Sequence, residues 1–208
     1  MLKTIPELMS IIPEHEEIIE DQDSVLIFGF PGIGKTYAFE HQEELNLTLQ
    51  DSDSSHFHWV YPEGDEEFKN PVLDEYGEKV PHPAWPSNYA QYIELTGREQ
   101  VKKPDYIMIS THEIVMNTLA NLKFESFTII PDKSAKNYFL ELYKKRGSNE
   151  AFIKMMSDNW EGFIDGTKKR AFLMGSHIVL VGPERKYRSL YDFLAADPKS
   201  LFAMEFDK

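Results

Sequence analysis

The chain has no cysteine, no long apolar run and few arginines, and each shortage narrows what the protein can be. Without cysteine it forms neither disulfide bonds nor zinc–thiolate sites, and it has no thiol nucleophile. Its longest apolar runs, residues 25–30 and 178–181, are far shorter than a helix that spans a bilayer. The first residues also lack the apolar core of a secretion signal. We therefore expect a cytoplasmic protein with no membrane partner.

Positive charge is scarce as well. Lysines and arginines number 22 against 35 aspartates and glutamates, which leaves a formal net charge of −13. Extended DNA or RNA needs clustered cations to neutralise its phosphates, so it is a disfavoured partner. The remaining composition is ordinary: 208 residues, 41% hydrophobic and 13% aromatic, are enough for a real core in a single domain.

Residues 29–36 form a motif with a well-defined chemistry. They read Gly-Phe-Pro-Gly-Ile-Gly-Lys-Thr, which matches G-x-x-x-x-G-K-[ST], and they directly follow the apolar run 25–28. Glycines let successive backbone N–H groups curl around a phosphate, and the next helix adds its positive dipole end. Lys35 is expected to reach the β- and γ-phosphates, and the Thr36 hydroxyl to ligate Mg²⁺. The predicted nucleotide-binding residues are Gly29, Pro31, Gly32, Ile33, Gly34, Lys35 and Thr36.

Apolar runs that alternate with helical patterns predict an α/β fold. The predicted strands cover residues 24–28, 45–50, 105–110, 127–130 and 177–181. The predicted helices cover residues 35–44, 88–95, 113–121, 133–146, 149–164 and 187–195, and residues 5–20 read as one or two short helices. Strands separated by helices favour a five-stranded, mainly parallel sheet with helices on both faces. Ligands of such sheets bind beyond the carboxyl ends of the strands.

Two carboxylates follow the predicted second strand, where it should open toward the phosphates. Asp51 can hold Mg²⁺, because this ion takes hard oxygen ligands and keeps several waters. Asp53 points the same way along an extended chain, so it can orient an acceptor or take the proton of its hydroxyl. The stretch Asp-Ser-Asp-Ser-Ser is also typical of a surface turn or a helix N-cap, and this alternative stays open.

Residues 56–104 are rich in proline and aromatic side chains and show little periodicity before residue 88. Long segments without a regular pattern are usually functional or inserted subdomains, so we expect this one to bind the acceptor. Its aromatic side chains can stack on a base, or can simply bury a segment that has little regular structure. Arg98 can grip an acceptor phosphate or be an ordinary surface residue. The aromatic residues in question are Trp59, Tyr61, Trp85, Tyr89 and Tyr92.

The chain resembles the P-loop kinases of small molecules. Residues 29–36 match their phosphate-binding loop, and Asp51-x-Asp53 is similar to the D-x-D motif of shikimate and gluconate kinases. The resemblance implies the three-layer α/β sandwich of P-loop NTPases. It also implies that the first aspartate serves Mg²⁺ and the second serves the substrate.

The segments 127–133 and 142–147 are similar to the fourth strand and lid of nucleoside monophosphate kinases. This implies a lid within residues 133–165, whose Arg146 closes on the transferred phosphoryl group. The alternative for Arg146 is an exposed helix end, where cations suit the helix dipole. The chain departs from the pattern at its third strand, which ends Ile-Ser-Thr-His without the usual aspartate. His112 there can contact the γ-phosphate or be a partly buried histidine.

We expect an ATP- and Mg²⁺-dependent kinase of a small acceptor, with a nucleotide or nucleoside favoured. Its catalytic residues would be Lys35, Asp53 and Arg146, and its metal ligands Thr36 and Asp51. The alternative is a P-loop ATPase or nucleotide-gated regulatory protein that uses residues 56–104 to dock a partner. A polynucleotide 5′-end kinase would use the same chemistry, but the net charge argues against it.

Overall fold

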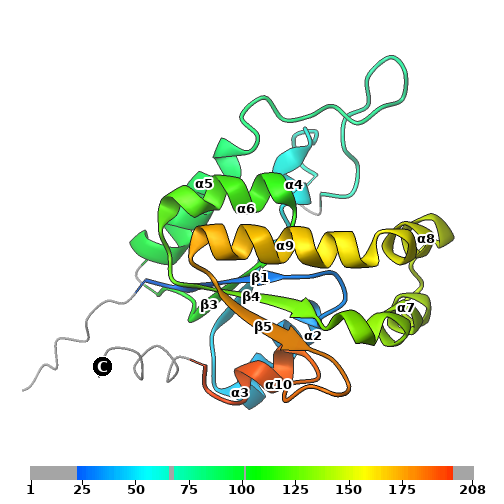
Figure 1. Cartoon of the computed structure of the whole chain (residues 1–208). Helices are drawn as coiled ribbons and strands as arrows, with labels where there is room; N and C mark the ends of the chain where they lie inside the picture. The colour runs from blue at the N-terminus through cyan, green and yellow to red at the C-terminus, as the bar shows by residue number, and fades with distance from the viewer. Residues whose placement is uncertain (1–22, 66–67, 101, 199–208) are drawn as a thin grey trace, which may run out of the picture.

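Figure 1 shows the computed structural model, which describes residues 23–65, 68–100 and 102–198. The helices predicted for residues 5–20 lie outside the described residues. Among the helices that are described, none combines the length and the apolar composition needed to cross a membrane.

The five strands form one parallel sheet. They are β1 (Val25–Gly29), β2 (Leu49–Asp51), β3 (Tyr106–Ser110), β4 (Ser126–Pro131) and β5 (His177–Val181). Every neighbouring pair is parallel, and the strand order is β2-β3-β1-β4-β5. The predicted parallel α/β sheet is confirmed. Because all five strands run the same way, the residues that follow them gather at one edge of the sheet.

The main helices are α2 (Lys35–Glu40), α3 (Gln42–Leu45), α4 (Ser55–His58), α5 (Ser87–Glu94), α6 (Glu113–Leu119), α7 (Lys136–Lys145), α8 (Glu150–Asp158), α9 (Trp160–Met174) and α10 (Leu190–Leu194). A π-helical turn, Leu95–Glu99, extends α5, and 3-10 turns occupy Ala120–Leu122 and Lys133–Ala135. In Figure 1, α5, α6 and α9 cover one face of the sheet and α2, α3 and α10 the other. The helix pair α7 and α8 lies beyond the carboxyl ends of the strands.

The central strand β1 is buried along its whole length, as its uninterrupted apolar sequence predicts. Its side chains alternate between the two cores. Val25 and Ile27 belong to the cluster that includes α2 and α10, whereas Leu26 and Phe28 belong to the cluster that includes α5 and α6. A strand packed on both faces is held rigidly, so the loop at its end is held rigidly too.

The element bounds differ from the prediction in three places. The predicted helix 35–44 breaks into α2 and α3, and the predicted strand 45–50 shrinks to Leu49–Asp51 because Asn46 adopts a left-handed conformation that ends α3. The predicted helix 149–164 breaks at Asn159, where α8 ends and α9 begins. The second of these helices also continues to Met174, ten residues beyond the predicted end at residue 164.

The segment between α4 and α5 contains little regular structure, as predicted. It leaves the body of the protein as a long excursion, described for residues 59–65 and 68–86, that is visible at the top of Figure 1. Isolated bridges from Trp59 to Pro81 and from Leu73 to Lys79 join its outgoing and returning halves.

Candidate functional site

The motif of residues 29–36 forms the turn between β1 and α2, at the carboxyl edge of the sheet. Gly32 and Gly34 have φ angles of 81° and 97°, a left-handed region that favours glycine. The side chain of Lys35 folds back over the turn, and its Nζ donates a hydrogen bond to the carbonyl of Gly29 at 2.9 Å. A Cβ on Gly29 would lie 2.9 Å from Cδ of this lysine, so glycine makes room for it.

Two distant helices hold the turn in place. The carbonyl of Ile33 accepts a hydrogen bond from the Leu190 amide, at the start of α10, at 3.0 Å. The carbonyl of Pro31 accepts one from the Tyr143 hydroxyl, on α7, at 2.9 Å. The ring of Tyr143 also lies directly against Gly32, where a Cβ would be 2.6 Å from its Cε1 atom. Sequence reasoning missed Tyr143, because nothing in its local pattern marks a partner 112 residues away.

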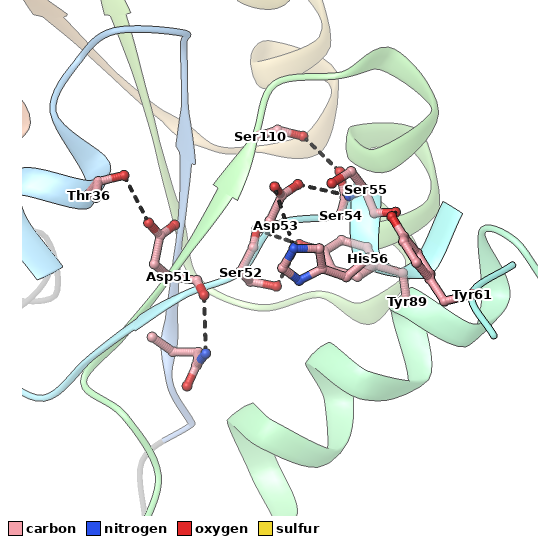
Figure 2. Close-up of polar contacts among 11 residues, drawn as sticks. Thr36, Asp51, Ser52, Asp53, Ser54, Ser55, His56, Tyr61, Tyr89 and Ser110 are labelled. Atoms are coloured by element: carbon pink, nitrogen blue, oxygen red, sulfur yellow. Dashed lines mark hydrogen bonds and ion pairs between the residues drawn. The ribbon is translucent and has the colours of Figure 1, made fainter. Parts of the chain in front are cut away.

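Thr36 and Asp51 come together as a pair of oxygen ligands. Figure 2 shows the Thr36 hydroxyl directed at the Asp51 carboxylate, and its Oγ1 donates to Oδ2 at 3.3 Å. Adjacent ligands of an octahedral Mg²⁺ ion lie about 3 Å apart, so the pair fits this ion. Burial raises the pKa of Asp51, while the Lys35 ammonium and the Thr36 hydrogen bond lower it. Over the described residues no group of three acidic or histidine side chains gathers as a metal site. Magnesium bound to a phosphate often takes only one or two carboxylates from the protein, so Thr36 and Asp51 are enough to serve as its protein ligands.

Asp53 lies just beyond β2 and also closes a turn. Its Oδ1 accepts the amide of Ser55 at 2.9 Å, and its Oδ2 lies 3.9 Å from Nε2 of His56. In Figure 2 the carboxylates of Asp51 and Asp53 point to one side of the chain, and Ser52 points to the other. The Asp53 side chain is 62% exposed, so a ligand can reach it. Asp53 can therefore stabilise the turn and still contact a ligand.

The predicted charged residues lie within electrostatic reach of one another. Burial lowers the pKa of Lys35, the carboxylates of Asp51 and Asp53 raise it, and the guanidinium of Arg146 lowers it. These side chains come from α2, the end of β2 and the end of α7, so only the fold brings them together. The Lys35 ammonium is desolvated and lies near two carboxylates and an arginine. Such a lysine is well suited to form charged hydrogen bonds with a phosphate.

Arg146 caps the C-terminus of α7 and is exposed. Its Nε donates to the Ser148 hydroxyl at 2.8 Å. Its guanidinium carbon lies 4.8 Å from the centre of the Tyr143 ring and 5.4 Å from that of Phe152. Cation–π contacts of this kind hold the head group while leaving its outer N–H donors available. The neighbouring cation Lys144 instead pairs with Glu141 at 2.6 Å.

Buried hydrogen bonds fix the segment that carries the two aspartates. Ser52 is 5% exposed, and its hydroxyl donates to the phenol of Tyr89, on α5, at 3.0 Å. Burial raises the pKa of Tyr89 far above its ordinary value. The Ser54 hydroxyl lies 3.4 Å from that of Ser110, which ends β3 (Figure 2). Sequence reasoning missed both serines, because their partners are far away in the chain.

A pocket of about 590 Å³ opens beside the turn of residues 29–36; we call it the side pocket. Phe30 and Pro31 form its wall at the turn, and residues 111–114 form the wall that follows β3. The remaining wall comes from α8 and α9 and consists of Phe152, Met155, Met156, Phe163, Thr167 and Arg170. None of the described lining residues belongs to 56–104, so the acceptor site expected in that segment stays a prediction. Sequence reasoning missed this pocket, although α8 and α9 carry more large apolar side chains than one buried face needs.

A second, smaller pocket has a volume of about 160 Å³. It is lined by residues that follow β4 and β5, among them Asp132, Tyr138 and Arg185. Hydrogen bonds from Ser134, together with the Arg185 guanidinium, lower the pKa of Asp132 to about 2.

Arg98 does not take part in this site. Its Nε donates to Asp23 at 2.7 Å and its Nη2 to the carbonyl of Leu122 at 2.6 Å, while the guanidinium covers the ring of Phe124. Because Asp23 precedes β1, this arginine lies at the amino end of the sheet and ties segments together. The suggestion that it grips an acceptor phosphate is therefore wrong. Asp105 caps the same end through the Thr48 amide, as its place before β3 predicts.

The aromatic residues of 56–104 divide between packing and exposure. Tyr89 is in the core, and Trp85 and Tyr92 pack against it, which favours the burial interpretation for these three. His58 stacks between Trp59 and Trp85, with ring centroids 4.0 and 4.7 Å apart.

Two residues lie closer to the site. The hydroxyl of Tyr61 donates to the carbonyl of Ser55 at 3.4 Å, next to the aspartate turn. His112 lines the side pocket at the start of α6, and its contact with a γ-phosphate stays a prediction.

No protein-family model matches the chain, and no curated protein matches it either. The sheet and the geometry described above therefore carry the functional argument.

Proposed function

We propose that the protein is an ATP- and Mg²⁺-dependent kinase that phosphorylates a small acceptor, a nucleotide or a nucleoside being favoured. The observation that carries this proposal is the pairing of Thr36 with Asp51 beside the turn that holds Lys35. An anion-binding turn accounts for triphosphate binding. A hydroxyl–carboxylate pair at its rim accounts for a metal on the phosphates, which phosphoryl transfer requires.

The residues of the turn would bind the donor. Mg²⁺, when bound to Thr36 and Asp51, would neutralise phosphate charge and orient the γ-phosphate. Lys35 would exchange the Gly29 carbonyl for phosphate oxygens, a change that favours binding because a charged acceptor makes a stronger hydrogen bond than a neutral carbonyl.

In the transfer step, an acceptor hydroxyl oxygen forms a bond to the γ-phosphorus while the bond to the β–γ bridging oxygen breaks. ADP leaves, and the hydroxyl proton passes to Asp53. Oδ1 of this residue is engaged by the Ser55 amide, so Oδ2 is the oxygen suited to take the proton. Arg146 would neutralise the charge of the transferring group from the α7 side.

The test is an incubation of γ-labelled ATP with a panel of nucleosides, nucleoside monophosphates and other small alcohols. Lys35→Ala should abolish transfer while the protein stays folded, and Asp53→Asn should keep ATP binding and lose turnover. Asp74→Asn is the matched control, because Asp74 closes a turn of the same kind, with its Oδ1 on the Tyr76 amide at 2.9 Å, in the excursion. Normal turnover by Asp53→Asn would remove that residue from the mechanism.

The excursion favours a second candidate function, a nucleotide-gated binding or regulatory ATPase. It exposes four large apolar side chains, Phe68 (42%), Val72 (36%), Leu73 (56%) and Tyr76 (81%), and such a group suits a docking surface. This candidate predicts hydrolysis of ATP without transfer to any acceptor of the panel. Hydrolysis that rises only with a protein partner would favour it over the kinase.

A further inference from the structure

We propose that the side pocket binds the acceptor as an uncharged, nucleoside-like molecule, rather than as a nucleoside monophosphate. This rests on the proposed kinase function and narrows it to one chemical class. The class is a planar heteroaromatic ring system that has carbonyl or ring-nitrogen acceptors on one edge and a free hydroxyl at the other end.

The side pocket lies directly against the phosphate-binding turn. Phe30 and Pro31 belong to the phosphate-binding turn and also line the pocket, so a ligand in it touches the turn directly. Thr111 lines the pocket too, and it follows Ser110, whose hydroxyl is 3.4 Å from that of Ser54, the neighbour of Asp53 in the chain. The end of the ligand nearest the turn is therefore the end that faces the phosphates and the carboxylate.

The lining of the side pocket is mostly apolar. A volume of about 590 Å³ is well within the roughly 300–1,000 Å³ of sites that enclose small molecules. Phe152 and Phe163 offer aromatic rings, and Met155 and Met156 offer flexible, polarisable side chains that adapt to a flat ring. Walls of this kind favour the face of a heteroaromatic ring and offer nothing to the hydration shell of a phosphate.

The charged side chains of the pocket wall pair with each other. Among the described lining residues, Arg170 contributes the permanent cation and Glu113 the anion, and they pair at 3.0 Å between Nη1 and Oε2. The positive charge is thus already neutralised. A phosphate dianion placed here would meet a carboxylate as well as the guanidinium, whereas a neutral ligand faces no net charge.

The pocket wall also contains a hydrogen-bond donor without a partner among the described residues. Nε of Arg170 is buried and has no hydrogen-bond partner in the described structure. A buried N–H without a partner is unfavourable, so a small rotation of the Arg170 side chain that turns Nε toward the pocket is favoured when a ligand supplies a carbonyl or ring-nitrogen acceptor. The adjacent Glu113 carboxylate can accept from a ring N–H or amino group. A donor beside an acceptor matches the edge of a nucleobase.

The experiment is direct binding by isothermal titration calorimetry with the five common nucleosides and their 5′-monophosphates, with and without a non-hydrolysable ATP analogue. We expect at least one nucleoside to bind about tenfold or more tightly than its own monophosphate, because the monophosphate adds an anion that the wall does not neutralise. Equal or tighter binding of every monophosphate would overturn the proposal.

Two variants locate the ligand. Met155→Trp fills the pocket from a side chain that is 44% exposed, so it should weaken nucleoside binding about tenfold or more and leave the affinity for the ATP analogue within about twofold. Leu173→Trp is the matched control, a large side chain added on α9 at a residue that is 72% exposed and outside the pocket lining. It should change neither affinity.

The outcomes separate this proposal from the kinase proposal. If Met155→Trp weakens the ATP analogue as much as the nucleoside, the pocket holds the donor base, and the inference is wrong while the kinase proposal stands. If no nucleoside binds although the ATP analogue does, the inference is again wrong. If a nucleoside binds and no transfer from labelled ATP is seen, the pocket assignment stands and the kinase proposal fails.

Discussion

The contact between the turn of residues 29–36 and α7 can be tested with two glycines of that turn. Gly32 and Gly34 both have left-handed φ angles, so alanine is strained at each, at about 1–2 kcal/mol. They differ in their surroundings. A Cβ on Gly34 meets no heavy atom within 4 Å, whereas a Cβ on Gly32 would lie 2.6 Å from the Tyr143 ring.

The ring of Tyr143 cannot move aside cheaply. It is fully buried, its hydroxyl is bound to the Pro31 carbonyl, and Phe152 packs edge-on against it at 5.2 Å. Displacing a packed core side chain costs about 1–3 kcal/mol. We therefore expect Gly32→Ala to lower the free energy of unfolding by about 1–3 kcal/mol more than Gly34→Ala does. For a protein of this size each kcal/mol shifts Tm by about 2–4 °C.

The assay is urea unfolding followed by tryptophan fluorescence for both single variants. The double variant Gly32→Ala/Tyr143→Ala measures the interaction free energy between the two positions. In the double variant the clash is absent, so adding the glycine substitution to Tyr143→Ala should cost no more than Gly34→Ala costs in the natural chain. If the two glycine variants are equally unstable, or if the cost at Gly32 is unchanged without the ring, the turn does not depend on its contact with α7.

Two further outcomes follow from charged side chains at the sheet edge. Arg146→Gln should lower the turnover number by roughly 10²-fold or more with little change in ATP affinity, and Lys145→Gln, its neighbour, should change neither in the same steady-state assay. Because Ser134 and Arg185 lower the pKa of Asp132 from 3.8 to about 2, the carboxylate adds stability that is complete above about pH 4 and is lost as the pH falls toward 2. Asp132→Asn should therefore be less stable than the natural chain in urea unfolding at pH 6, and the difference should shrink at pH 2. A constant difference would contradict this.

Local features of the fold were predictable because they depend on short stretches of chain. The run at residues 25–28 is apolar at every position, and this is typical of a strand buried on both faces. The turn that follows needs glycine at specific angles, so its letters and its shape are closely linked. Element bounds were less predictable. The helical pattern of 149–164 continues through Asn159, whereas the chain breaks there into α8 and α9.

The candidate site was predictable only in part. Asp51 and Asp53 were identified because they directly follow a strand, and strand ends meet at one edge of a parallel sheet. The turn at Asp53 was also foreseen as an alternative, and the structure contains it. For Arg98 two interpretations stayed open, because a lone arginine gives no indication of which end of the sheet it will reach, and its pairing with Asp23 favours the structural one.

The sequence by itself determined the glycine-rich turn of residues 29–36, the parallel α/β class and the carboxylates that follow β2, because each is encoded by neighbouring residues. Only the tertiary structure decided which side chains meet there. Tyr143 reaches Pro31 across 112 residues, and the side pocket draws its walls from the turn, from residues after β3 and from α8 and α9. Such contacts depend on how helices pack on the sheet, and packing is set by the whole set of side chains at once rather than by any local pattern.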